Sequence, residues 1–275
     1  MNTLVILAAR EIRDGLRNRW IAASILLLTT ISLSLYFLGS APTGAVKATS
    51  LDVTIVSLTS LSVYLLPLLA LMLSFDALVG EFEGGTMLLL LTYPVTRGQI
   101  VLGKFAGHMA ILAIAIFIGY GSTAIVIAFS EGSSTDNWPA YGLMMASTWL
   151  LGGIFIALGY LVSILVRERA SAVGAAIGVW LVAVLLYDLG LMGLLLSDTN
   201  QVMSEDLFTA LLMANPTDSY RIFNFAGVDA VSRAAGMSDI AVKANLSLGW
   251  LLLVMLAWTV IPLWATILRF SHREL

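Results

Sequence analysis

Six long apolar segments constrain this chain more than any other feature of its sequence. A helix that crosses a bilayer needs about 20 consecutive, mostly apolar residues, and each segment comes close to that length or exceeds it. The segments run over residues 20–38, 53–75, 105–129, 140–166, 170–196 and 246–268. Only 11 % of the residues are charged, whereas about 25 % is typical of soluble domains. We therefore predict an all-α integral membrane protein, with residues 1–275 forming a single transmembrane domain.

The distribution of basic residues predicts the orientation of these spans. An even number of spans places both termini on one side, and cytoplasmic loops carry an excess of Lys and Arg. With cytoplasmic termini, ten of the fourteen Lys and Arg lie inside: Arg10, Arg13, Arg17, Arg19, Arg97, Lys104, Arg167, Arg169, Arg269 and Arg273. We expect N-in, C-in topology.

Residues 1–19 have the pattern of an amphipathic helix. At 100° per residue, one face carries the apolar side chains Val5, Ala8, Ala9, Ile12 and Leu16, and the other carries Arg10, Arg13, Asp14 and Arg17. We predict a helix that lies along the membrane interface. The alternative is an ordinary solvated turn before the first span.

Residues 76–104 form a long polar interruption on the predicted cytoplasmic side. The apolar run Met87–Leu91 within it is far shorter than a bilayer requires. Thr86 is expected to cap a short helix over this run, and Pro94 to end it, since the residue before a proline is pushed out of helical geometry. We predict a helix with an apolar face toward the cytoplasm. The alternative is a re-entrant or interfacial segment that touches only lipid.

The same segment contains two further patterns, one structural and one misleading. Thr96 followed by Gln99 is a capping-box pattern that begins the helix of the third span. Gly98, Gly103 and Lys104 match a phosphate-binding loop except that Phe105 replaces the Ser or Thr that would hold magnesium. We therefore exclude nucleotide binding here and interpret Lys104 as a snorkelling residue at the membrane interface.

The connection over residues 197–245 is long for a loop, and long loops usually carry structure or function. Ser204 and Thr217 are placed to begin two helices, and Gly227 is placed to end the second. We predict a helical platform on the periplasmic face; the alternative is an unordered acidic loop. The predicted contacts with a periplasmic partner are Glu205, Phe208, Leu212, Tyr220 and Phe223.

Asp188 is the candidate intramembrane polar site, because a charge within a span is costly and often functional. We expect it to pair across a helix interface or to reach the outer interface. A role in the substrate path of a self-contained secondary transporter or channel is the alternative.

The sequence contains few residues that could bind a metal ion or catalyse a reaction. The chain has no Cys, only two His, and eleven Met without helical pairing, so we predict no metal site and no catalytic residues. Its net charge of −3 argues against nucleic acid as a partner. Clusters of small residues predict close helix packing within the chain or between two copies: Gly152, Gly153, Gly159, Gly174, Ala175 and Gly178.

The chain resembles the membrane subunits of ABC-2 type transporters. The resemblance covers nearly the whole length and rests on the N-terminal helix, the six spans and the motif at 81–97. The residues of that motif here are Glu81, Glu83, Gly84, Gly85, Thr86, Met87, Leu88, Leu89, Leu90, Leu91, Tyr93, Pro94 and Arg97. In that family this loop forms the coupling helix that engages a separate ATPase.

More narrowly, the sequence is similar to the permeases used in maturation of nitrous oxide reductase. That resemblance implies a bacterial inner-membrane protein without a cofactor of its own, working with two copies of an ATPase subunit that binds ATP and Mg. It also implies a second copy of the permease, a periplasmic copper-site assembly protein, a copper chaperone and membrane lipid as partners. The cargo it leaves open is copper, a sulfur species or nothing at all. A scaffold that only holds partners together is a further alternative.

Overall fold

The computed structural model describes residues 3–39, 50–131, 137–197, 204–226 and 247–273, and every element in these ranges is a helix. Within these ranges, six helical segments are long and apolar enough to cross a membrane, as the sequence predicts. They are α2 (Arg19–Gly39), α3 (Ser50–Ser74), α6 (Arg97–Glu131), α7 (Trp138–Leu165), the continuous segment of α8 (Arg169–Leu181), η1 (Val182–Leu186) and α9 (Tyr187–Ser197), and α14 (Leu248–His272).

Helix α7 is the centre of the bundle. It packs against α3, α6 and α14, and 72 % of its spanning stretch is buried inside the protein. Small residues permit this packing, since Gly152 lies against Leu112 of α6 and Gly159 against Ser74 of α3. The α8–α9 segment is the opposite case, with only 6 % of its spanning stretch buried. The predicted packing role of Gly152 and Gly159 is confirmed, whereas Gly174 and Gly178 of α8 face open space.

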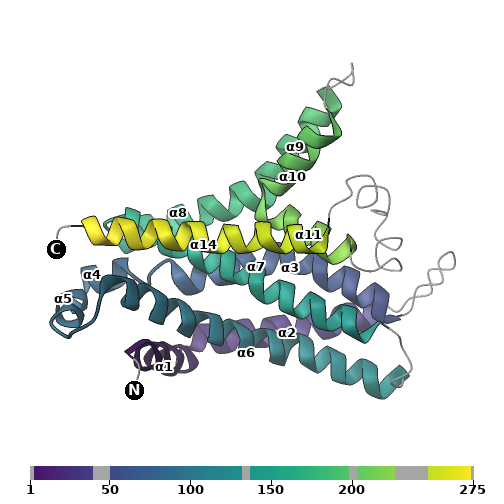
Figure 1. Ribbon diagram of the computed structural model, residues 1–275. Helices are drawn as coiled ribbons and strands as arrows, with labels where there is room; N and C mark the ends of the chain where they lie inside the picture. Colours follow the sequence, from purple (N-terminus) through teal and green to yellow (C-terminus); the bar gives the residue numbers. More distant parts are fainter. Residues whose placement is uncertain (1–2, 40–49, 132–136, 198–203, 227–246, 274–275) are drawn as a thin grey trace.

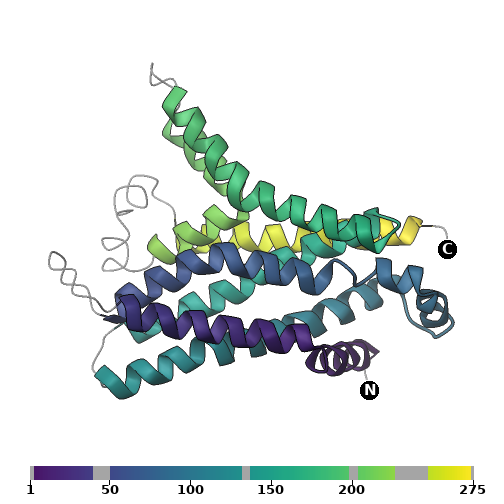
Figure 2. The same ribbon diagram turned by 180° about the vertical axis from the view of Figure 1, so that it is seen from behind.

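The two ends of the bundle carry different short helices (Figures 1 and 2). Both chain termini lie at one end, which we call the terminal end, together with α1 (Thr3–Leu16), α4 (Val79–Glu83) and α5 (Thr86–Leu91). The opposite end, the far end, carries α11 (Pro216–Ala226). Helices α9 and α10 (Glu205–Met213) project from the bundle at an angle.

Two predicted helix starts are confirmed by their hydrogen bonds. At the start of α6, the Thr96 N–H donates to Gln99 Oε1 at 3.0 Å and the Gln99 N–H donates to Thr96 Oγ1 at 3.2 Å. The Ser204 hydroxyl accepts from the Leu207 N–H at 3.2 Å and caps α10. Helix α11, in contrast, begins at Pro216, one residue before the predicted Thr217. The predicted end at Gly227 lies outside the described residues.

Helix α11 corrects the prediction of an external platform. It folds back into the bundle, where the Tyr220 hydroxyl lies 2.8 Å from Thr148 Oγ1 and Ser147 donates to Asn224 at 2.9 Å. Tyr220 is 0 % exposed and Phe223 is 3 % exposed. The expectation that these two side chains contact a partner is therefore wrong in this structure, because they fill the core. Phe208 and Leu212 of α10 are half-buried, and the side chain of Glu205 is outside the described residues.

Candidate functional site

The connection between α3 and α6 turns sharply between α4 and α5. Helix α4 ends at Glu83 with Gly84 as its C-cap, and Gly85 adopts a left-handed conformation with φ of 68°, which favours glycine. Helix α5 then begins at Thr86, so the predicted role of Thr86 as the cap is corrected to Gly85. The Thr86 hydroxyl instead donates to the Glu81 carboxylate. The turn thus holds α4 and α5 together through a side chain as well as through the backbone.

The apolar run of α5 has two faces. Met87 is only 1 % exposed and packs in the core, whereas Leu88 and Leu89 are 57 % and 65 % exposed. Leu90 and Leu91 are half-buried against the core. The predicted apolar surface of this helix therefore consists of Leu88 and Leu89, and Met87 is corrected from a surface residue to a core residue.

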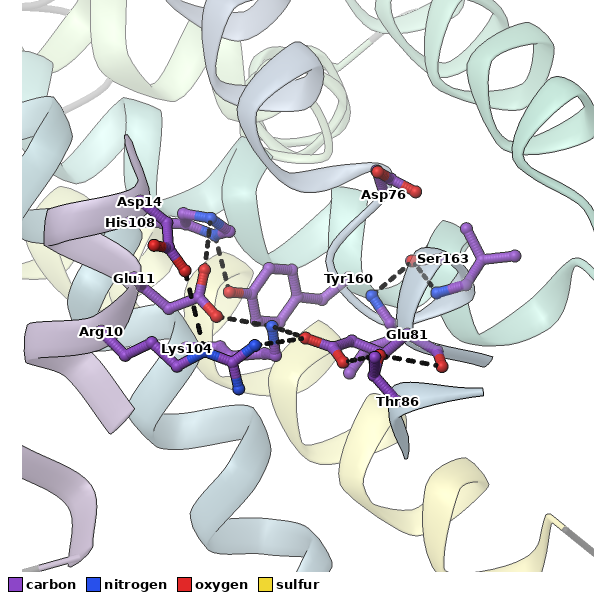
Figure 3. A network of polar contacts seen from close by, with 12 residues as sticks. Arg10, Glu11, Asp14, Asp76, Glu81, Thr86, Lys104, His108, Tyr160 and Ser163 are labelled. Carbon is purple, nitrogen blue, oxygen red and sulfur yellow. Dashed lines mark hydrogen bonds and ion pairs between the residues drawn. The ribbon is translucent and has the colours of Figure 1, made fainter. Parts of the chain in front are cut away.

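A group of charged side chains beneath α5 joins three helices (Figure 3). Lys104 Nζ of α6 lies 2.5 Å from Glu11 Oε1 of α1 and 3.1 Å from Glu81 Oε1 of α4. We call Glu11, Glu81, Lys104 and His108 the Lys104 cluster. The Lys104 side chain is 5 % exposed, so its interpretation as a snorkelling residue is wrong. A buried ammonium with two carboxylate partners is an ionic contact screened little by solvent.

His108 extends the Lys104 cluster to the central helix. Its Nε2 atom is 3.6 Å from Glu11 Oε2, and its Nδ1 atom is 2.7 Å from the Tyr160 hydroxyl of α7. Arg10 adds a weaker contact to Glu81, at 3.8 Å. The cluster thus touches α1, α4, α6 and α7, although the first and last of these helices are far apart in the sequence.

Two glycines of α6 bring α1 close enough for this contact. A Cβ atom on Gly103 would lie 2.7 Å from Leu7 Cβ, and one on Gly107 would lie 2.5 Å from Glu11 Cβ and 3.0 Å from the Ala8 carbonyl oxygen. The spacing of four residues is the small-x-x-x-small pattern of close helix packing. Gly103 and Gly107 form this pattern in the sequence, although Gly103 also belongs to the misleading phosphate-loop pattern.

Replacing Gly107 by Ala is therefore expected to force α1 away from α6. Overpacking of this kind costs about 1–3 kcal/mol. Gly121→Ala is the matched control on the same helix, because nothing lies within 4 Å of a Cβ there. Unfolding of the two purified variants in mixed detergent micelles measures the difference. Equal stability of the two variants would contradict the close packing of α1 on α6.

Contacts from α7 and α8 hold α4 on its other side. Ser163 Oγ of α7 accepts from the backbone N–H groups of Leu78 and Val79, at 3.0 and 2.9 Å, and so satisfies buried donors at the start of α4 that have no partner within the helix. Arg169 Nε, at the start of α8, lies 2.9 Å from Asp76 and 3.5 Å from Glu83. The Arg169 N–H also donates to Glu83 Oε1 at 2.8 Å. Glu83 and Asp76 thus tie the connection to α8.

The end of α14 makes the third set of contacts. Arg97 donates to the carbonyl oxygens of Phe270, Ser271 and Arg273, which lie at the C-terminal end of α14 where backbone acceptors lack partners. The Arg273 guanidinium stacks over the Phe82 ring of α4, 4.3 Å from its centroid. Helix α4 is therefore held by α6, by α8 and by α14.

A cavity of about 270 Å³ opens beside the Lys104 cluster. Its polar lining includes the charged residues Arg10, Glu11, Asp14, Asp76, Glu81, Lys104 and Arg169. Acids and bases are both present, and most of them pair with each other between helices, so the lining does not favour one kind of ion. In the part of the chain that the structure describes, no group of three His, Cys, Asp or Glu side chains is placed to hold a metal ion.

Asp188 is paired at the far end. Arg221 of α11 lies 2.7 Å from Asp188 Oδ2 and 3.0 Å from Asp218 Oδ1. The expected pairing of Asp188 across a helix interface is confirmed. The same interface includes the π-helical turn η1, whose Ala183 carbonyl accepts from Asn215 Nδ2 at 3.0 Å and from Thr217 Oγ1 at 3.2 Å.

Comparison with known proteins shows which family the chain belongs to. The model of the ABC-2 family transporter proteins matches residues 5–275. The chain is 43 % identical over 276 residues to the probable ABC transporter permease protein NosY of Stutzerimonas stutzeri, which covers 99 % of each chain. It is 45 % identical over 261 residues to the probable ABC transporter permease protein NosY of Pseudomonas aeruginosa, which covers 94 % of this chain and 92 % of that relative. The chain belongs to the ABC-2 family of transporter proteins.

Proposed function

We propose that this chain is the permease subunit of an ABC transporter and that α5 binds a separate ATPase subunit. The permease role is supported by the family and by the two similar permeases. The observation that carries the proposal for α5 is the exposure of Leu88 and Leu89, 57 % and 65 %, on a helix otherwise fixed to the bundle. ATP and Mg would be bound by the partner, and this chain would hydrolyse nothing.

The proposed orientation rests on the distribution of charge. Arg10 on α1, Arg97 and Lys104 near the start of α6, and Arg169 at the start of α8 are among the ten basic residues that the positive-inside rule assigns to the cytoplasm. The terminal end is therefore proposed to face the cytoplasm, and the far end the periplasm. Helix α5 is then available to a cytoplasmic ATPase.

The contacts of α4 support a mechanical role. A displacement of α5 would reach α1 and α6 through Glu81 and Lys104, α8 through Arg169, and α14 through Phe82 and Arg273. Because these ionic and stacking contacts hold their partners at short distances, α4 cannot move far without moving the helices that it contacts. The spans would then tilt together and carry the change to the far end.

The biological role proposed is copper-centre maturation of nitrous oxide reductase, which the similarity to NosY permeases suggests. Two copies of the permease would act with two ATPase subunits and a periplasmic copper-site assembly protein. Helix α10 projects from the bundle and bears the half-buried Phe208 and Leu212, so it is the proposed contact for that protein. Copper, a sulfur species or motion alone remains the proposed output.

The decisive experiment replaces Leu88 and Leu89 together by Asp. Burying a leucine is worth about 1.5–3 kcal/mol, so losing two from an interface is expected to weaken ATPase binding at least about 100-fold. The measurement is the amount of ATPase that co-purifies with the tagged permease in mild detergent. Leu207→Asp, on exposed α10 at the other end, is the matched control and should retain the ATPase.

The outcomes separate the proposal from its rivals. Full retention of the ATPase by the Leu88→Asp/Leu89→Asp variant would show that α5 is not the binding surface. Full reductase maturation with an ATPase that cannot hydrolyse ATP would instead favour a scaffold. Maturation that fails for Asp188→Asn while the Leu88→Asp/Leu89→Asp variant stays active would favour a self-contained transporter.

A further inference from the structure

A second, larger cavity at the terminal end has a strongly basic lining. Its volume is about 590 Å³, and it lies where α7 ends, where the chain turns into α8 and where α14 ends. The residues around it are Ile164, Leu165, Arg167, Arg269, His272 and Arg273. It shares none of its lining with the cavity beside the Lys104 cluster.

The positive charge of this basic pocket is not balanced within the described part of the chain. Arg167 and Arg269 are exposed, and among the described residues neither side chain forms a hydrogen bond or an ion pair. Arg273 is held in place, since its guanidinium donates to the carbonyl oxygens of Ile164 and Val166 at 3.0 and 3.3 Å. The guanidinium groups of Arg167 and Arg269 are therefore available to bind an anion, next to the guanidinium of Arg273, which is held in place.

The basic side chains of the pocket repel one another. Burial lowers the pKa of Arg273, and repulsion by Arg167 and Arg269 lowers it further. A bound anion would relieve this repulsion. Guanidinium groups suit phosphate in particular, because their planar N–H groups form paired hydrogen bonds with phosphate oxygens.

The surroundings of the pocket indicate where such a phosphate comes from. Leu165 lines the pocket and is 58 % exposed, and Leu268, which precedes Arg269 in α14, is 41 % exposed. Exposed apolar side chains directly beside basic ones, at the ends of two spans, match the boundary between acyl chains and headgroups of a bilayer. Basic pockets between helix ends on the cytoplasmic side bind anionic lipid headgroups.

We propose that this basic pocket binds the phosphate headgroup of an anionic phospholipid, held by Arg167 and Arg269 with its acyl chains along Leu165 and Leu268. The site goes beyond the proposed coupling function and uses none of its contacts with the ATPase. It does adjoin them, because Arg273 stacks on Phe82 of α4. A lipid here would therefore stabilise the end of α14 against the connection that carries α5.

The test measures thermal stability of the purified full-length protein in a zwitterionic detergent while phosphatidylglycerol is added. The wild type is expected to gain stability, and the Arg167→Gln/Arg269→Gln variant to need at least about tenfold more lipid for the same gain, since it loses charge-assisted hydrogen bonds to the phosphate. Arg13→Gln/Arg17→Gln is the matched control, with two exposed cations removed from the same end. It should respond like the wild type.

Two further arms give outcomes that decide the proposal. Phosphatidylcholine should have little effect, and an equal response to it would overturn the anionic specificity. Inorganic phosphate that reproduces the whole effect would identify a free anion instead of a lipid.

The proposal is also overturned if the two arginine variants titrate alike, or if the Arg167→Gln/Arg269→Gln variant loses the ATPase while its response to lipid is unchanged. In the second case the pocket would belong to the contact with an acidic protein surface. Retention of the ATPase together with loss of the lipid response is the result expected.

Discussion

Replacing Lys104 by Met is expected to destabilise the protein by about 3–5 kcal/mol, the usual cost of removing one partner from a buried ionic contact. The reason is that Glu11 and Glu81 would be left facing each other, with side chains only 15 % and 13 % exposed. Unfolding of the purified protein in mixed detergent micelles measures the change. Arg17→Met is the control, since it removes an exposed cation from the same end of the bundle.

A triple variant distinguishes the contribution of the Lys104 cluster to stability from its proposed role in transmitting motion. Glu11→Gln, Glu81→Gln and Lys104→Met together remove all three charges, and neutral replacement of a buried ionic group often restores stability. If the cluster transmits motion from α4 to α1, the triple variant should fold and bind the ATPase, but ATP should no longer move α1. The chain has no Cys, so pairs of spin labels can be introduced without background.

Two results would count against this role of the cluster. One is a Lys104→Met variant as stable as the Arg17→Met control, because the contact would then be worth no more than a surface pair. The other is a triple variant in which ATP changes the distance between labels on α1 and α6 as it does in the wild type.

The spans and helix starts were predictable because their causes are local. A span needs a run of apolar residues, and a cap needs a hydroxyl or an amide three residues from its partner, as at Thr96 and Ser204. The cap lies within one helical turn and the apolar run within one continuous segment. The exposed face of α5 was less predictable, since a run of five apolar residues does not say that Met87 turns inward while Leu88 and Leu89 turn outward.

The Lys104 cluster was not predictable in the same way, because Glu11 and Lys104 are 93 residues apart in the sequence. Only the packing of α1 on α6 brings them together. The pair Gly103 and Gly107 indicates that packing in the sequence, but Gly103 also belongs to the phosphate-loop pattern, which points to a different function. A glycine pair spaced by four residues beside a lysine is better read first as a helix contact.

Helix α11 was placed outside the bundle for a similar reason. The predicted outer surface was based on the apolar side chains Tyr220 and Phe223, but polar residues of α11 find partners inside the bundle. Asn224 bonds to Ser147, and the Tyr220 hydroxyl bonds to Thr148. Buried polar groups need such partners, and a single sequence does not show which helix provides them.

Replacing Arg221 by Met is expected to destabilise the far end by roughly 2 kcal/mol or more at pH 7, a buried-pair cost reduced by the partial exposure of this site. Arg221 is the cation shared by Asp188 and Asp218. Burial raises the pKa of Asp218 to about 6, and repulsion by Asp188 adds to the shift, while Arg221 and Asn215 oppose it. Without Arg221 the pKa of Asp218 should rise further.

The sign of the pH dependence follows from this raised pKa. A carboxyl group whose pKa is higher in the folded than in the unfolded protein stabilises the fold fully at pH below about 4, and this contribution is lost as the pH rises through about 6. A shift of that size corresponds to roughly 3 kcal/mol. Asp218→Asn should remove this part of the pH dependence, whereas Arg221→Met should extend the loss to higher pH.

The measurement is the free energy of unfolding in mixed micelles at several values between about pH 4 and pH 8, compared between wild type and each variant. Other groups titrate in this range, including those near Asp218, so the informative quantity is the difference between Asp218→Asn and the wild type. That difference should shrink at low pH and favour Asn as the pH rises. If the two curves stay parallel, Asp218 is ionised throughout, and its pairing with Arg221 outweighs its burial.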